Sequence, residues 1–241
     1  MNVGAGITVV GLTADDAGGT REVFRETLRQ GVAPRRQLRE AGFRASRLPH
    51  VTSDADDAVL AYEVTPLPAS SRTPCAHATE KADLVRQRLA AYAVVTSERG
   101  VLLTRLSQTT GRPGLWILPG GGVDAGEHPA EAVVREVWEE AGQDVELGEL
   151  VDVSSSHRVG IGRGDVVEDF HAVRLLFTAS CSQPSEPVVH DVGGSTESAA
   201  WFSIADAVDP EAPGYPEGGM ASWALDAVRA CHLVIEGTGE E

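Results

Sequence analysis

The sequence has little cysteine, few aromatic residues and no long apolar stretch. Its 241 residues include only Cys75, Cys181 and Cys231, which lie far apart and form no Cys-x-x-Cys pair. This spacing excludes a disulfide-stapled scaffold and favours reduced thiols. No apolar run approaches the roughly 18 residues that span a bilayer, and the first ten residues lack a basic leader. We therefore expect a cytoplasmic protein without a membrane partner.

Positive charge is scarce in the second part of the chain. Residues 86–241 contain 10 Lys and Arg against 25 Asp and Glu, whereas residues 1–85 contain 10 against 11. An acidic surface repels nucleic-acid polymers, so nucleic acid is an unfavourable partner. A small phosphate ester can still bind if a divalent cation bridges the two negative partners.

A stretch rich in Pro and Ser divides the chain. We predict an N-terminal α/β segment over 1–65, a linker over 66–83, a main domain over 84–210, and a C-terminal loop and helix over 211–241 that pack on it. Helices are predicted over 19–29, 34–40, 129–141 and 222–235. Strands are predicted over 4–12, 58–64, 90–96, 101–106, 115–118, 145–153, 171–179 and 200–204. The polar residues 154–165 are predicted to form a loop. Without a regular βαβ alternation, these elements indicate an α+β fold with a mixed sheet.

The most informative stretch runs from Gly120 to Gly142 and reads GGGVDAGEHPAEAVVREVWEEAG. Pro129 suits the first helical turn, and Gly142 is a natural stop. Between them, three glutamates at i, i+3 and i+4 share one side of the helix: Glu136, Glu139 and Glu140. The other side carries a stripe expected to face the core: Val133, Val134, Val137, Trp138 and Ala141.

Local helix physics opposes this acidic cluster. Like charges at i and i+4 repel, and anions are disfavoured near a helix C-terminus. A divalent cation would reverse the sign of the interaction, because hard carboxylate oxygens suit Mg2+ or Mn2+. Taken alone, such a cluster is more often a solvated acidic face than a metal site.

The wider spacing favours the metal site. The pattern Gly121-x5-Glu127-x7-Arg135-Glu136-Val137-x-Glu139-Glu140-x-Gly142 resembles the signature of the Nudix hydrolase family. Only the last position departs, where Gln143 stands in place of an aliphatic residue, and this bears on packing rather than on chemistry. The resemblance covers about residues 88–205. It implies a mixed-sheet α/β/α sandwich with a smaller N-terminal α/β segment beside it.

The resemblance also implies roles for individual residues. Glu136, Glu139 and Glu140 would bind the metal, with the Gly120 carbonyl as a further ligand. Glu127 and Arg135 would pair and brace the loop against the helix. The implied activity is Mg2+-dependent hydrolysis of a phosphoanhydride bond in a nucleoside diphosphate derivative or a nucleoside triphosphate, with Mn2+ as the alternative metal.

Weaker signals concern the substrate and a further acid. Many Nudix proteins use an acidic residue from a distant loop, and Glu197 stands where such a residue is often found, with Glu168 as the alternative. Arginines near the motifs are candidate contacts for substrate phosphate, although a solvated or ion-paired role competes for each. They are Arg105, Arg112 and Arg158.

The N-terminal segment has an open role. Residues 35–43 echo residues 135–143, as a degenerate copy of the motif or by chance. Residues 21–47 carry a net charge of +5, and Arg21, Arg25 and Arg29 would share one face of the predicted helix. A basic helical face allows a non-catalytic ligand sensor that binds nucleic acid. The preferred interpretation is that this face docks on the acidic domain and supports a homodimer.

Overall fold

The computed structural model describes residues 5–15, 18–68, 82–161 and 165–237. Its contacts form two compact units. The first comprises Met1–Ala90, Gly122–Pro129 and Val153–Leu175, and the second comprises Ala91–Gly121, Ala130–Asp152 and Leu176–Glu241. Most of the predicted linker, residues 69–81 with Cys75, lies outside the described residues.

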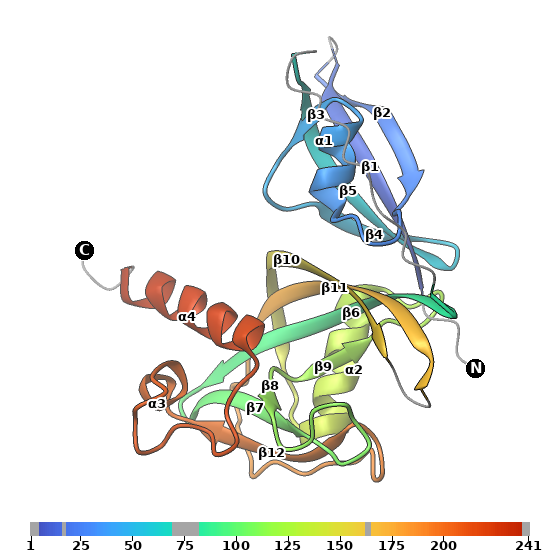
Figure 1. The fold of residues 1–241 in the computed structure, drawn as a ribbon. Helices are drawn as coiled ribbons and strands as arrows, with labels where there is room; N and C mark the ends of the chain where they lie inside the picture. The colour runs from blue at the N-terminus through green and yellow to red at the C-terminus, as the bar shows by residue number, and fades with distance from the viewer. Residues whose placement is uncertain (1–4, 16–17, 69–81, 162–164, 238–241) are drawn as a thin grey trace. The chain divides into compact units, whose positions relative to one another are not determined.

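The first unit contains a five-stranded sheet (Figure 1). Its elements are β1 (Gly6–Ala14), β2 (Thr20–Thr27), α1 (Pro34–Glu40), β3 (Phe43–Ala45), β4 (His50–Asp54) and β5 (Asp57–Pro66). The strand order is β2-β1-β5-β3, with β4 also paired to β5. Strands β1 and β5 are parallel, whereas β2, β3 and β4 pair antiparallel, so the sheet is mixed. Ile7, Leu38 and Tyr62 are fully buried in its core.

The helix predicted over 19–29 is wrong, because this segment forms strand β2. Gly18, at φ +80°, turns the chain back so that β2 pairs antiparallel with β1. Thr20, Val23 and Thr27 are β-branched and suit a pleated strand. The alternating Arg and Glu residues resemble a helical charge pattern, but pairing with β1 decides the structure. The basic helical face that depended on this helix is therefore absent.

The main sheet has seven strands. They are β6 (Leu84–Ser97), β7 (Gly100–Leu106), β8 (Trp116–Ile117), β9 (Gly120–Gly122), β10 (Glu146–Ile161), β11 (Val167–Ser180) and β12 (Thr196–Phe202). The order is β10-β11-β6-β7-β12, with β8 on β7 and β9 on β6. The strands predicted over 90–96 and 101–106 form a hairpin, in which Thr96 pairs with Val101 and Ser97 with Gly100.

The loop predicted over 154–165 is wrong for most of its length. Strand β10 continues to Ile161, and residues 162–164 lie outside the described residues. Strand β10 is at the edge of the sheet, where polar side chains face solvent at little cost. A polar composition therefore did not end the strand.

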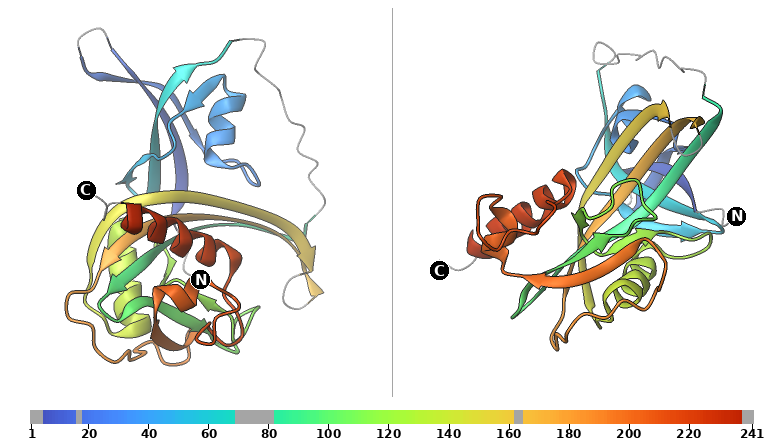
Figure 2. Two further views of the ribbon diagram at one scale, coloured as in Figure 1. Left: turned by 90° about the vertical axis from the view of Figure 1, so that its left-hand side faces the viewer. Right: turned by 60° about the horizontal axis from the view of Figure 1, so that its bottom comes forward.

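Helices cover both faces of the sheet within the second unit (Figures 1 and 2). Helix α2 (Pro129–Ala141) lies on one face, and α3 (Ile204–Val208) and α4 (Ser222–Gly237) lie on the other. Tyr92 and Trp223 join β6 to α4, with ring centroids 4.8 Å apart. The predicted α+β class with a mixed sheet is confirmed.

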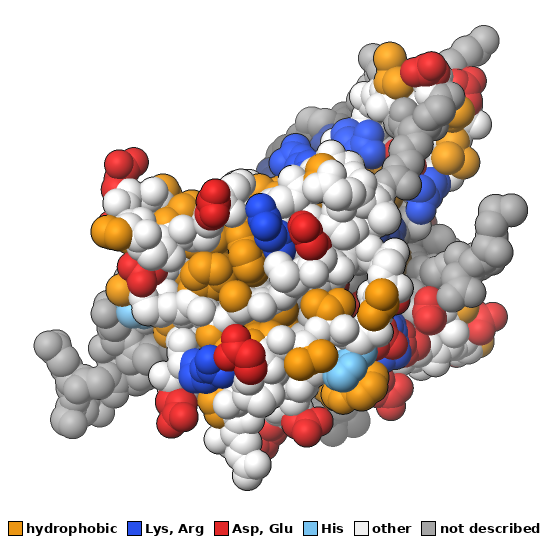
Figure 3. Space-filling view, turned by 90° about the horizontal axis from the view of Figure 1, so that it is seen from below, with side chains coloured by type: hydrophobic (Ala, Val, Ile, Leu, Met, Phe, Trp, Pro, Cys, Tyr) orange, Lys and Arg blue, Asp and Glu red, His pale blue; other side chains and the backbone are white. Residues whose placement is uncertain are grey.

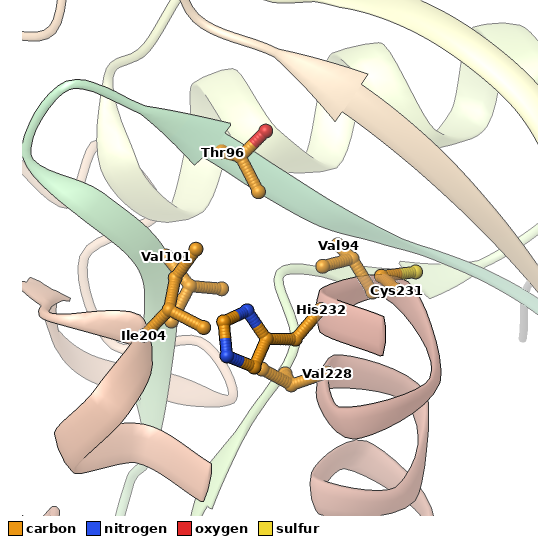
Figure 4. A pocket seen from close by; sticks show the side chains of 7 residues that line it. All are labelled: Val94, Thr96, Val101, Ile204, Val228, Cys231 and His232. Carbon is orange, nitrogen blue, oxygen red and sulfur yellow. The ribbon is translucent and has the colours of Figure 1, made fainter. Parts of the chain in front are cut away.

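The seam between the hairpin and helices α3 and α4 leaves one small recess (Figure 4). Its lining is mostly apolar and consists of Val94, Thr96, Val101, Ile204, Val228, Cys231 and His232. Cys181 is buried and Cys231 half-buried, both as free thiols. Burial raises the pKa of both thiols. This packing seam carries no residue of the Gly120–Gly142 motif.

The outer surface mixes side chains of several kinds. Acidic side chains are scattered over the face in Figure 3, and hydrophobic side chains gather in patches between them. Within the described ranges, no helix combines the length and the apolar character needed to cross a membrane.

Candidate active site

Helix α2 presents the three glutamates of the motif. It begins at Pro129 as predicted, and Gly142 follows its end at φ +63°. Val133, Val137 and Ala141 are fully buried, so they fix the rotation of the helix on the sheet. The predicted core stripe is wrong at Val134 and Trp138, which are 39% and 50% exposed. These two side chains lie at the rim of the apolar stripe.

Arg135 holds two of the carboxylates. Its Nη1 atom lies 3.1 Å from Glu136 Oε1 and 3.1 Å from Glu139 Oε2. All three side chains are partly exposed, so each ion pair contributes little to stability. The arrangement nevertheless shows that both carboxylates reach one point, where a positive charge lies between them.

Glu140 is buried behind this pair. Its Oε2 accepts a hydrogen bond from the Gly120 backbone N–H at 3.0 Å, and its Oε1 accepts one from the Thr196 hydroxyl at 2.5 Å. Burial, together with the charge of Glu136, raises the pKa of Glu140 to about 7, even though these hydrogen bonds lower it. A bound cation would favour the ionised form, because it offsets the cost of burying the charge.

Strand β9 has glycine at two positions where a side chain would meet other atoms. A side chain at Gly121 would overlap the Glu136 carboxylate, and one at Gly120 would overlap the Ala91 carbonyl. Gly120 also has φ +138°, a conformation that L side chains rarely adopt. Gly121 therefore leaves the space that the Glu136 carboxylate occupies, and Gly120 allows the close approach of β9 to β6.

The donor set fits a hard divalent cation. Carboxylates are the ligands that Mg2+ and Mn2+ prefer, and the absence of a side chain at Gly121 lets the Glu136 carboxylate lie against β9. Across the described ranges, no three His, Cys, Asp or Glu side chains already converge as a metal cluster. Arg135 lies between the carboxylates, so a cation would have to replace it there.

A second group of charges lies in the first unit, on β6, β10 and β11. Glu168 is buried and accepts from Arg86 Nη1 at 3.3 Å and from Arg158 Nη2 at 2.9 Å. Both guanidinium groups also lie over the Phe170 ring, 6.0 and 5.3 Å from its centroid. The two arginine side chains are more than half exposed, so most of their donors face solvent.

A family model described as the NUDIX domain matches residues 86–219, more than half of the chain. The chain belongs to the Nudix family.

Curated relatives match part of the chain. Diphosphoinositol polyphosphate phosphohydrolase 3-alpha from Homo sapiens is 54% identical over 96 residues, which cover 40% of this chain and 52% of that protein. YjhB from Bacillus subtilis, whose name assigns it provisionally to the ADP-ribose pyrophosphatases, is 30% identical over 115 residues, 48% of this chain and 51% of that protein. The chain thus spans about half the length of the curated relatives it matches.

Solved structures that match part of the chain include the MutT protein from Methanosarcina mazei Go1. It has a TM-score of 0.46 and 19% identity, and the match covers 64% of this chain and 99% of that chain. A MutT Nudix hydrolase from Burkholderia pseudomallei has a TM-score of 0.41 and 23% identity, over 60% of this chain and 97% of that chain.

The remaining predicted residues of the Nudix site have varied surroundings. The Glu127 carboxylate accepts from the Asp124 backbone N–H at 3.1 Å, and its pairing with Arg135 stays a prediction. Arg105 donates from Nε to the Gly114 carbonyl at 3.3 Å, while Arg112 and Glu197 are exposed. Arg158 is engaged with Glu168.

Sequence reasoning missed two arginines of this Nudix chain. Arg86 joins Arg158 on Glu168, and the Arg88 guanidinium lies 3.3 Å from where a Cβ of Gly122 would stand. Both lie on β6, two residues apart, so they share a face of the strand. The alternation Arg86-x-Arg88 just before the apolar part of β6 was the signal that could have found them.

A polar network around the buried His171 and Asp169 ties the N-terminal residues 28–30 to strands of the same unit. Gln87 Nε2 lies 3.2 Å from the Leu28 carbonyl and 3.0 Å from His171 Nδ1, while His171 Nε2 lies 2.9 Å from Ser155 Oγ. Gln30 Nε2 donates to Asp169 Oδ1 at 2.7 Å and to the Arg86 carbonyl at 3.1 Å.

The same network includes a His–Asp pair. His157 Nε2 lies 2.8 Å from Asp169 Oδ1. Burial tends to raise the pKa of the Asp169 carboxyl, but bonds from Gln30 and His157 outweigh it and hold that pKa below its usual value. The N-terminal segment thus completes a polar cluster of the Nudix-matching strands.

Proposed function

We propose that this chain is a divalent-metal-dependent hydrolase that cleaves a phosphoanhydride bond in a nucleoside diphosphate derivative or a nucleoside triphosphate. Mg2+ is the expected metal, with Mn2+ as the alternative. The complete carboxylate set on α2 carries this proposal, because it forms against local helix electrostatics and beside a glycine that leaves it room.

Each motif residue has a proposed role. Glu136, Glu139 and Glu140 would hold the cation, with the Gly120 carbonyl as a further ligand. When bound, the cation would neutralise the diphosphate and polarise the attacking water. Glu127 and Arg135 would brace the loop and the helix. Thr196 would orient Glu140 by donating to its carboxylate.

Glu197 is the better candidate for the additional acid. The charge of Glu168 is already balanced by Arg86 and Arg158, which favours a structural or substrate-positioning role for it. Glu197 is exposed and directly follows Thr196, the residue that donates to Glu140. Glu197→Gln should therefore lower turnover more than Glu168→Gln.

A more highly charged substrate is a second candidate. Arg86 and Arg158 present exposed donors around the half-exposed Phe170 ring, which suits a phosphorylated ligand of several negative charges. The human relatives named diphosphoinositol polyphosphate phosphohydrolases support this class. Arg105 and Arg112 remain proposed substrate contacts of the second unit.

The sensor interpretation loses its main support. It rested on a basic helical face, but β2 is a strand, and Arg25 pairs with Glu22 and Asp54. Arg29 pairs with Glu40 of α1. Two of the three arginines of the predicted face are thus each paired with a carboxylate of the N-terminal segment.

A substrate panel tests the proposal. Purified protein would be incubated with nucleoside triphosphates, nucleotide sugars, ADP-ribose, dinucleoside polyphosphates and diphosphoinositol polyphosphates, with Mg2+, with Mn2+ and with a chelator. We expect metal-dependent product release from at least one class. Absence of release from every class with either metal would overturn the proposal.

A further inference from the structure

The last turn of α2 ends against a segment far along the chain. The last carbonyls of a helix lack intrahelical partners, and water or side chains usually supply them. Here the Glu139 carbonyl accepts from the backbone N–H groups of His190 and Asp191, at 2.7 and 3.1 Å. The Ala141 carbonyl accepts from the Val188 N–H at 3.0 Å. Backbone donors from 188–191 therefore hold the end of the helix that bears Glu139 and Glu140.

A stacked ring pair reinforces this end. The Trp138 and His190 rings lie face to face, with centroids 4.3 Å apart and an interplanar angle of 16°. A Cβ at Gly142 would stand 3.0 Å from His190 Nε2 and 3.1 Å from the Val188 carbonyl. The exposed imidazole of His190 thus stacks on Trp138 and lies close to the chain reversal after α2.

Trp138 lies at the surface rather than in the core. It is half exposed, although a large aromatic side chain gains most when it is fully buried. It directly precedes Glu139, and its own carbonyl accepts from the Gly142 N–H at 2.8 Å. The stack therefore restrains the turn on which the carboxylates stand, rather than the core of the molecule.

We propose that Trp138 and His190 are positioning residues, whose stack fixes the last turn of α2 so that Glu139 and Glu140 hold the divalent cation. The proposal rests on the proposed function for its catalytic consequence. Neither ring would touch the substrate phosphoanhydride or the attacking water. They would act by holding the backbone of Glu139, whose carbonyl accepts a hydrogen bond from the His190 N–H.

The test compares His190→Ala with His190→Phe, which keeps a flat ring for stacking. Val192→Ala is the matched control, because Val192 lies in the same segment with a side chain that is 90% exposed. We expect His190→Ala to lower kcat by about 10- to 100-fold, as displacement of a catalytic group does, with a smaller change in KM for the substrate. His190→Phe should restore most of the loss, and Val192→Ala should have no effect.

Metal affinity supplies a readout apart from turnover. Titration with Mn2+ should give a higher Kd in His190→Ala than in wild type, His190→Phe or Val192→Ala. The near-ultraviolet circular dichroism of Trp138 is the part of the signal that Trp138→Phe removes. This part should be smaller in His190→Ala than in wild type. In His190→Ala, hydrogen exchange should be faster than in wild type at the backbone amides of positions 190 and 191, which donate to the Glu139 carbonyl.

The outcomes separate the two proposals. If wild type hydrolyses no substrate but His190→Ala still weakens Mn2+ binding and Phe restores it, the proposed function fails and the positioning role stands. If wild type is active and His190→Ala matches it in kcat and in Mn2+ affinity, the positioning role is wrong. Equal loss in His190→Ala and His190→Phe would also overturn it, because stacking would then not be the cause.

Discussion

His171 shows how hydrogen-bond partners select one form of a side chain. Its ring is buried between Gln87 Nε2 and Ser155 Oγ. The Gln87 amide nitrogen can only donate, and its bond to the Leu28 carbonyl fixes that orientation. The Nδ1 atom of His171 must therefore accept, so the proton of the neutral ring is on Nε2 and is donated to Ser155.

This selection predicts a pH dependence of stability. Burial, together with the neighbouring His157, lowers the pKa of His171 to about 4, against the opposing effect of Asp169. An unfolded histidine has a pKa near 6.5, so between about pH 6.5 and 4 the unfolded chain binds the additional proton. Stability is therefore fully present above pH 6.5 and falls by up to about 3 kcal/mol as the pH drops towards 4.

Thermal melts from pH 7.5 to 4.5 would check this dependence. His171→Asn should flatten the fall in Tm towards acid pH, whatever its cost at pH 7.5. His50→Asn is the control, because His50 is exposed on β4 and should keep the slope of wild type. An unchanged slope in His171→Asn would show that another group causes acid instability.

At the scale of single elements, α2 could be predicted and β2 could not. Pro129, the apolar period and Gly142 all specify the same helix, so local signals agree with the fold. In residues 19–29 the Arg and Glu spacing favoured a helix, whereas the β-branched residues favoured a strand. Pairing with β1 settles this conflict, and such long-range pairing cannot be read from the segment itself.

The same limit applies to the site. The three glutamates and their common face follow from the motif and the helical period. The donors to Glu140 do not follow, because Thr196 is 56 residues away and meets Glu140 only when β12 joins the sheet. The exposure of Trp138 also depends on segment 188–191, which has no periodic pattern of its own.

Strand β9 gives an element-scale prediction. In Gly121→Ala the new methyl group would displace the Glu136 carboxylate, which is the flexible end of a side chain. We expect turnover to fall by about 10- to 100-fold, because a ligand carboxylate is moved, with little change in Tm. Kinetics and melting of Gly121→Ala and Gly111→Ala would be compared, since a Cβ at Gly111 meets nothing within 4 Å. Equal turnover in the two variants would contradict the proposed place of Glu136.

At the scale of the whole molecule, the N-terminal segment belongs to the network of the first unit. Gln30 donates to the Asp169 carboxylate and to the carbonyls of Arg86 and Asp169. Gln30→Ala removes these bonds, while Asp169 Oδ1 keeps His157 as a partner, so we expect a cost of about 0.5–1.5 kcal/mol for each bond lost. Chemical denaturation should show this loss, and Gln108→Ala, at an exposed position, should not.

Removal of residues 1–83 would disrupt this network more severely than Gln30→Ala. The truncated chain would lose the Leu28 and Gln30 partners of Gln87 and Asp169 together. We expect a lower soluble yield and loss of the predicted homodimer, measured by light scattering. If the truncated protein has the same Tm and the same number of subunits as the full chain, the N-terminal segment supports neither stability nor dimer formation.

The most direct test of metal-dependent catalysis by α2 is the hydrolysis rate of the best panel substrate against Mg2+ concentration, for wild type, Glu139→Gln and Glu131→Gln. Glu131 is an exposed acid in the first turn of the same helix and serves as the control. We expect saturable activation by Mg2+ in wild type and Glu131→Gln, and a loss of roughly 100-fold or more in Glu139→Gln at saturating metal. Near wild-type turnover in Glu139→Gln, or hydrolysis that persists without a divalent cation, would contradict metal-dependent catalysis by α2.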